Sequence, residues 1–303
     1  MADKERPISE GEALESFLAR LQSVREVKEI AGWETGFPKL SAALNGLLPG
    51  LTLLIGPPGC GKTAFARQLL DQVAQLNSVP GLCFTFSESK DDLRIRTLAR
   101  LSGVETREIR RGPAYLLHWY GVPKRHATEP EQMPPGWEKL KRAAEEAKGR
   151  LDLLYLFECN KKTTVNDIGR RIREVRKIKG SQRVMAVIDD SQRLGDPDSS
   201  LEARLPLVAE RLEELAMKLD IPLLATWPAL TASASMKIAP EEWAKRVAGG
   251  TIIVMKEDAE RTGQFTEPKR AVRLHVVKNR GGEKATINFD FSPGLSKFAQ
   301  AAD

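Results

Sequence analysis

A phosphate-binding loop at residues 56–63 constrains the fold of this chain more than any other feature. Its eight residues, Gly56-Pro57-Pro58-Gly59-Cys60-Gly61-Lys62-Thr63, fit the pattern G-x-x-x-x-G-K-[ST]. An apolar run at 51–55 precedes the loop, and a helix-forming stretch at 64–76 follows it. Glycines let backbone N–H groups turn toward phosphates, and a helix N-terminus adds partial positive charge. The pattern predicts a nucleoside triphosphate site in which Lys62 reaches the β and γ phosphates and Thr63 ligates Mg²⁺.

The composition indicates a globular protein with a mixed surface. The 303 residues are 41% hydrophobic, which is enough to build a core for one large or two average domains. The net charge of +6 comes from 47 basic and 41 acidic residues, so charge alone identifies no polyanionic partner. Cys60, Cys83 and Cys159 form no C-x-x-C pair, and no apolar run reaches membrane-spanning length. We therefore expect a cytoplasmic protein without a membrane partner.

Two acidic residues stand directly after predicted strands. Glu88 follows the apolar run 82–86, and the carboxyl ends of parallel strands are where open α/β sheets bind ligands. Glu88 is thus a candidate base for activating water, although an ordinary surface acid fits this position equally well. Asp189 follows the run 184–188, which in a P-loop protein is the Walker B pattern, whose acid holds Mg²⁺ through a water.

The remaining pattern predicts an α/β fold with a doubly wound, mostly parallel sheet and a terminal antiparallel β-ribbon. Hydrophobic periodicity predicts helices at 92–101, 137–148, 165–179 and 201–219. Predicted strands lie at 51–55, 82–86, 151–157, 184–188, 221–226, 251–255, 271–278 and 284–291. Residues 1–32 form an N-terminal amphipathic helix with a linker, and 33–303 form one domain. Within it, the Pro- and aromatic-rich stretch 110–136 is expected to be a loop excursion.

The order of these motifs resembles the RecA-like ATPases, and within them the C-terminal motor domain of DnaB-type replicative helicases. The likeness runs from about 35 to 298, and its last element is also similar to the RadA recombination ATPases. Besides the P-loop it rests on the segments Thr35-Gly36-Phe37, Ser87-Glu88, Leu98-Ala99-Arg100-Leu101-Ser102-Gly103-Val104, Ile188-Asp189-Asp190-Ser191-Gln192 and Val277-Lys278-Asn279-Arg280-Gly281-Gly282.

The resemblance implies an ATP-hydrolysing motor that uses ATP and Mg²⁺ and acts on single-stranded DNA. It implies that Glu88 polarises the attacking water and that Gln192 senses the γ-phosphate. Lys278 and Arg280 match the basic pair that reaches a neighbouring subunit's site as an arginine finger. The chain is then expected to assemble with itself, as a ring such as a hexamer or as a filament.

Two departures from that family leave an alternative open. Trp227 stands where the family carries Gln or His after the fifth strand, and the loop 195–204 has three acids and one base. Phosphate contact normally uses Lys or Arg. A KaiC-like, nucleotide-switched assembly or regulatory ATPase that binds no nucleic acid is therefore a second hypothesis.

Overall fold

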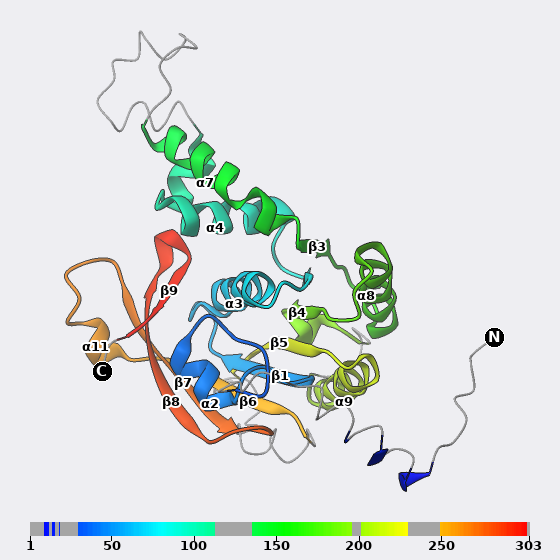
Figure 1. Cartoon of the computed structure of the whole chain (residues 1–303). Helices are drawn as coiled ribbons and strands as arrows, with labels where there is room; N and C mark the ends of the chain where they lie inside the picture. The colour runs from blue at the N-terminus through cyan, green and yellow to red at the C-terminus, as the bar shows by residue number, and fades with distance from the viewer. Residues whose placement is uncertain are drawn as a thin grey trace.

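The computed structural model describes residues 30–112, 135–195, 201–229 and 249–301, with a few isolated positions before residue 19 (Figure 1). These residues fold around a nine-stranded sheet with the order β3-β2-β4-β5-β1-β6-β7-β8-β9. The strands are β1 (Gly50–Gly56), β2 (Gly81–Thr85), β3 (Leu154–Glu158), β4 (Met185–Asp189), β5 (Pro222–Pro228), β6 (Thr251–Glu257), β7 (Arg270–Lys278), β8 (Ala285–Ser292) and β9 (Lys297–Gln300).

The predicted doubly wound fold is confirmed. Strands β1 to β6 pair in parallel, with β1 at the centre between β5 and β6. Strands β7, β8 and β9 continue the sheet in antiparallel pairs from β6 outward, which is the predicted terminal ribbon. All residues of β1 are buried, as expected for a parallel strand that is covered on both faces.

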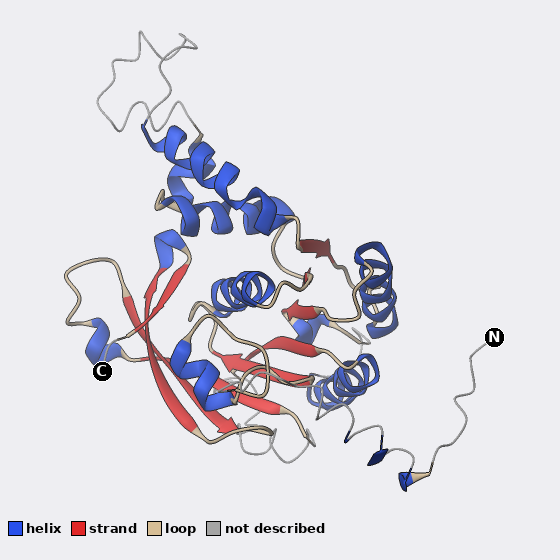
Figure 2. Cartoon of the chain, in the orientation of Figure 1, coloured by secondary structure: helices blue, strands red, loops and turns tan. Residues whose placement is uncertain are grey.

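Helices cover both faces of the sheet (Figure 2). The described helices are α2 (Pro38–Leu44), α3 (Lys62–Leu76), α4 (Lys90–Ser102), α5 (Thr106–Arg111), α7 (Pro135–Leu151), α8 (Val165–Lys179), α9 (Leu201–Leu219) and α11 (Ala259–Thr262). Because neighbouring residues of a strand face opposite sides, Leu53 packs with α8 and α9, whereas Leu54 packs with α3. Among the residues that the structure describes, no helix has the length and apolar character needed to cross a bilayer.

Helix boundaries follow local capping chemistry. At the start of α8, Thr164 accepts from the backbone N–H of Asp167, and the Asp167 carboxylate accepts from the N–H of Thr164. Gly180 ends this helix with a φ of 60°, a left-handed conformation that suits glycine. These signals lie in the sequence itself, and the expected bounds 165–179 match the observed ones.

Two sequence-based boundaries were wrong. The third strand was expected at 151–157, but Leu151 is the last residue of α7 and β3 begins at Leu154. Leu151 continues the helical spacing of the buried Leu140 and Ala147. The sequence pattern at Leu151 is therefore compatible with the end of a helix as well as with the start of a strand.

Both ends of the expected excursion at 110–136 are helical. Arg110 and Arg111 belong to α5, and Pro135 and Gly136 open α7. Residues 113–134 lie outside the described part of the chain, as does most of the expected N-terminal helix.

Candidate active site

The phosphate-binding loop joins the carboxyl end of β1 to α3, as predicted. Gly61 caps α3 with a φ of 99°, and a Cβ atom there would lie 2.9 Å from Cζ of Phe298. Only glycine meets both conditions. The Lys62 ammonium donates to the carbonyl oxygens of Gly56 and Pro57, at 2.8 and 2.9 Å. The lysine therefore lies over the loop in which phosphates would be bound.

The side chain of Cys60 points into the protein rather than toward a ligand. It is buried, and burial raises the pKa of its thiol. Its Sγ atom lies 2.8 Å from the position that a Cβ on Gly56 would take. Cys60 thus packs the loop against β1 in its neutral form.

Thr63, at the start of α3, and Asp189, at the carboxyl end of β4, are in direct contact. The Thr63 hydroxyl donates to Oδ2 of Asp189 at 2.8 Å, and the Thr226 hydroxyl donates to Oδ1 at 2.7 Å. Asp189 is 2% exposed, and burial raises its pKa although both hydroxyl groups act in the opposite direction. A buried carboxylate next to a hydroxyl ligand is a fitting place for a hard cation.

The fit to Mg²⁺ follows from the number of protein ligands. Mg²⁺ in nucleotide sites usually keeps several waters and takes one or two protein ligands in addition to substrate phosphates. Thr63 and Asp189 provide that number. Within the described ranges, no group of three or more His, Cys, Asp and Glu side chains is arranged to hold a metal by itself.

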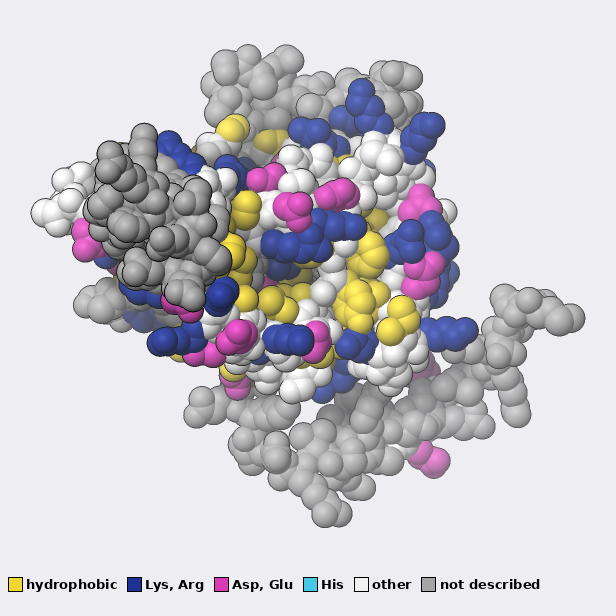
Figure 3. Space-filling model, turned by 90° about the horizontal axis from the view of Figure 1, so that it is seen from above, with side chains coloured by type: hydrophobic (Ala, Val, Ile, Leu, Met, Phe, Trp, Pro, Cys, Tyr) yellow, Lys and Arg dark blue, Asp and Glu magenta, His cyan; other side chains and the backbone are white. Residues whose placement is uncertain are grey.

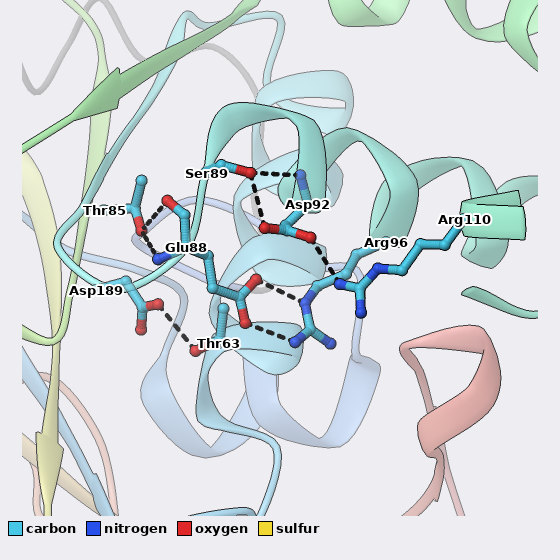
Figure 4. A network of polar contacts seen from close by, with 8 residues as sticks. All are labelled: Thr63, Thr85, Glu88, Ser89, Asp92, Arg96, Arg110 and Asp189. Carbon is cyan, nitrogen blue, oxygen red and sulfur yellow. Dashed lines mark hydrogen bonds and ion pairs between the residues drawn. The ribbon is translucent and has the colours of Figure 1, made fainter. Parts of the chain in front are cut away.

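Glu88 lies directly after β2, near Thr63 and Asp189, but it is held by an arginine (Figure 4). Nε and Nη2 of Arg96 donate to the two carboxylate oxygens of Glu88 at 2.7 and 2.5 Å. The main chain of Glu88 is fixed as well: its N–H donates to the Thr85 hydroxyl, which donates to its carbonyl oxygen, both at 3.1 Å.

Gln192 lies in a short 3₁₀ turn (Ser191–Arg193) directly after β4. Its Nε2 donates to the Asp190 carboxylate at 3.1 Å, and the N–H of Asp190 donates to Thr226 at 2.8 Å. Asp190 adopts a φ of 59°. The turn thus brings Gln192 back beside the strand ends where Asp189 lies.

Lys278 and Arg280 lie apart from this cluster. Lys278 ends β7, and Arg280 lies beyond the strand, where its Nη1 is 3.1 Å from Sδ of Met217. Burial raises the pKa of Glu213 on α9. The positive charges of Lys278 and Arg280 lower it, but the effect of burial is larger. The Arg280 guanidinium lies beside Gly50, the first residue of β1, whereas the P-loop follows the last.

Sequence reasoning missed two residues of the site. Thr226 was predicted only as the last residue of the strand 221–226, but its hydroxyl donates to Asp189. A hydroxyl residue at the carboxyl end of the strand next to β4 was the available signal. No signal in the sequence pointed to Arg96. It lies eight residues from Glu88, and helical side-chain pairs are expected only at spacings of three or four.

The face of the molecule that Figure 3 shows carries both signs of charge among its described residues. Lys, Arg, Asp and Glu side chains lie mixed with hydrophobic ones on this face (Figure 3). The mixture agrees with the near balance of acidic and basic residues in the sequence. Among the described residues of this face, the basic side chains are thus interrupted by acidic and hydrophobic ones.

The family model described as "DnaB-like helicase C terminal domain" matches residues 32–228. The chain belongs to this family. Among DnaB-like relatives, the replicative DNA helicase DnaB of Haemophilus influenzae is 25% identical over 236 residues, 74% of this chain and 46% of that protein. The DnaB helicase of Geobacillus stearothermophilus is 23% identical over 282 residues, 89% of this chain and 57% of that protein. The chain thus spans about half the length of these DnaB-like relatives.

Solved structures share the fold. One of them, described as an ATPase domain, superposes with a TM-score of 0.73 at 19% identity, covering 98% of this chain and 100% of that one. A DnaB-like replicative helicase, solved in a study of its interactions with primase, gives a TM-score of 0.71 at 19% identity. That match covers 96% of this chain and 68% of the other. These likenesses support the RecA-like fold that the motif order predicted.

Proposed function

We propose that this chain is an ATP-hydrolysing motor, a DnaB-like DNA helicase or translocase that acts on single-stranded DNA in replication or recombination. The observation that carries the proposal is the pairing of Thr63 with Asp189 at 2.8 Å beside a full phosphate-binding loop. Membership in the DnaB-like family supports the DNA-directed part. Residues 33–303 form the motor, and residues 1–32 form an N-terminal helix with a linker.

The nucleotide site consists of the loop residues Gly56, Pro57, Pro58, Gly59, Cys60, Gly61, Lys62 and Thr63. Lys62, which now donates to two loop carbonyls, turns to the β and γ phosphates when ATP enters. Thr63 and Asp189 would hold Mg²⁺, Thr63 as a direct ligand and Asp189 through a water. Bound there, the ion would supply positive charge at the β and γ phosphates.

Glu88 acts as the general base and accepts a proton from the attacking water. In this role its carboxylate must come within hydrogen-bond distance of that water. Gln192, placed beside the ends of β4 and β5, senses the γ-phosphate. Lys278 and Arg280 serve the nucleotide site of a neighbouring copy, because they lie at the opposite end of the sheet from their own P-loop. The working form is thus a ring, such as a hexamer, or a filament, and it operates in the cytoplasm.

The family match favours this motor over a KaiC-like assembly or regulatory ATPase that binds no nucleic acid. The acidic loop 195–204, which raised that second hypothesis, lies partly outside the described residues. The two functions differ in one measurable property, the response of ATP turnover to DNA.

The test compares wild type with Lys62→Ala, with and without single-stranded oligonucleotide and Mg²⁺. We expect single-stranded DNA to raise wild-type turnover and Lys62→Ala to lower it roughly a hundredfold or more, because one preorganised cation at the phosphates is lost. Lys177→Ala, on the exposed face of α8, is the matched control and should turn over normally. Displacement of a forked duplex then separates unwinding from translocation.

Unchanged turnover in Lys62→Ala would place the active site elsewhere. If single-stranded DNA does not change the rate of ATP turnover, the result would favour the regulatory ATPase instead.

A further inference from the structure

Arg96 occupies both oxygens of the proposed base. Its Nε and Nη2 atoms donate to Glu88 at 2.7 and 2.5 Å, the side-on geometry in which a guanidinium matches a carboxylate (Figure 4). The two side chains are 27% and 20% exposed, so water screens this pair less than it screens a surface ion pair.

Both partners stand on rigid parts of the fold. The main chain of Glu88 is held at both its N–H and its C=O by the Thr85 side chain, at the end of β2. Arg96 lies in the second turn of α4, whose first turn is fixed by the Ser89 cap on Asp92. The pair is thus built by a strand end and a helix rather than by two mobile surface side chains.

The charge of Arg96 is secured by its surroundings. Burial lowers its pKa, but the hydrogen bonds and charge of Glu88 outweigh this effect, and Asp189 and Asp92 add to it, so the pKa is raised overall. Deprotonation therefore cannot break the pair. The guanidinium also feels the negative charge of Asp189, the carboxylate that belongs to the proposed Mg²⁺ site.

A general base needs an oxygen lone pair directed at the proton it accepts. A guanidinium bound side-on occupies the lone pair of each carboxylate oxygen that faces it, so these lone pairs cannot be directed at a water. We propose that Arg96 is a positioning residue that restrains Glu88 and thereby keeps the basal rate of ATP hydrolysis low. This inference rests on the proposed function, because it assumes that Glu88 activates water.

Removing the restraint should raise basal turnover. We expect Arg96→Ala to increase kcat for ATP in the absence of DNA about threefold to tenfold, the factor that corresponds to the net free energy of one ordinary hydrogen bond. The KM for ATP should stay within about twofold, since only the base is affected. Damage to the fold would lower kcat rather than raise it. An increase in kcat therefore indicates that Arg96 restrains Glu88, and a decrease would indicate that Arg96 supports it.

Three further variants sharpen the test. Arg94→Ala is the matched control, because Arg94 lies on the same helix and pairs with the exposed Asp91. It should leave kcat unchanged. Arg96→Lys keeps the charge but cannot engage both oxygens side-on, so its kcat should fall between wild type and Arg96→Ala. In Glu88→Gln/Arg96→Ala the gain should vanish, because the base through which Arg96 acts is absent.

The possible failures are distinguishable. If Glu88→Gln hydrolyses ATP as fast as wild type, the proposed role of Glu88 is wrong and the inference fails with it. If Glu88→Gln is inactive while Arg96→Ala binds a fluorescent ADP analogue normally and is no faster than wild type, only the restraint is overturned. A slower Arg96→Ala that Arg96→Lys rescues would show that Arg96 supports the base instead.

Discussion

Asp189 is a buried carboxyl group whose ionisation affects the stability of the fold. It is 2% exposed, and its carboxylate accepts hydrogen bonds from the hydroxyl groups of Thr63 and Thr226. Burial raises its pKa above the value it has in the unfolded chain. The folded state therefore holds this proton more tightly, and the associated stability is present at acid pH and lost as the pH rises through the folded pKa.

At neutral pH and without Mg²⁺, the buried charge of Asp189 thus works against folding. We predict that Asp189→Asn raises the free energy of unfolding by roughly 1 kcal/mol at pH 7, as changes that relieve active-site strain often do. The gain should shrink as the pH is lowered, because the wild-type carboxyl becomes neutral there. Urea denaturation at several pH values in the presence of a chelator measures this.

The same substitution should abolish Mg²⁺-dependent ATP turnover, so stability and activity move in opposite directions. Asp190→Asn is the control, since Asp190 lies one residue beyond the strand and is only partly buried. A loss of stability in Asp189→Asn that is independent of pH would contradict the account of the buried charge.

At the scale of elements, the last strand is fastened to the P-loop helix by one side chain. Gln68 of α3 donates through Nε2 to the carbonyl oxygen of Phe298 at 2.9 Å, and its Oε1 accepts from the Phe298 N–H at 2.8 Å. Phe298 packs edge-on against Phe65 of α3 and stacks on Phe291 of β8. Strand β9 therefore closes over the helix that begins at Lys62.

We predict that Gln68→Leu lowers the free energy of unfolding by about 2–4 kcal/mol. The substitution preserves the size of the side chain but leaves the buried N–H and C=O of Phe298 without this partner, at a cost of about 1–3 kcal/mol for each group. Guanidinium denaturation measures the change. The matched control is Gln75→Leu on the exposed side of the same helix, whose amide pairs with Arg150.

A change below about 0.5 kcal/mol in Gln68→Leu, the range of ordinary surface substitutions, would mean that aromatic packing alone holds β9.

The elements that could be predicted from sequence are those with a long hydrophobic pattern. Helices α8 and α9 match their expected bounds because their apolar residues repeat over four to five turns. Short elements such as α5, α11 and β9 were missed, since four to six residues carry no readable period. Thr63 and Asp189 could each be singled out from the sequence, Thr63 by the phosphate-binding loop pattern and Asp189 by the apolar strand before it, although their contact could not. The contact of Arg96 with Glu88 was not, because it depends on how the loop after β2 turns into α4.

On the scale of the whole molecule, the phosphate-binding loop and Arg280 lie at opposite ends of the central strand β1. The P-loop follows Gly56 at one end of β1, and Arg280 lies beside Gly50 at the other, about 20 Å away at the rise of an extended strand. Arg280 borders a groove of about 760 Å³ with Glu213 and Met217 on its wall. Arg280 is therefore too far from its own P-loop to act there without a large rearrangement of the fold.

This separation leads to the last prediction, which concerns assembly. If Arg280 completes the site of a neighbour, Arg280→Ala should bind ATP normally but hydrolyse it roughly a hundredfold or more slowly, because it lacks the cation that stabilises the transition state. Glu88→Gln should also be nearly inactive. Mixing the two variants should restore part of the turnover, since an intact Glu88 on one chain can then face an intact Arg280 on another. Lys284→Ala, an exposed cation beyond the same turn, is the control and should neither lose activity nor complement. Mixtures without recovery, together with a monomeric mass in the presence of ATP and Mg²⁺, would remove Arg280 from the active site and the ring or filament from the proposed mechanism.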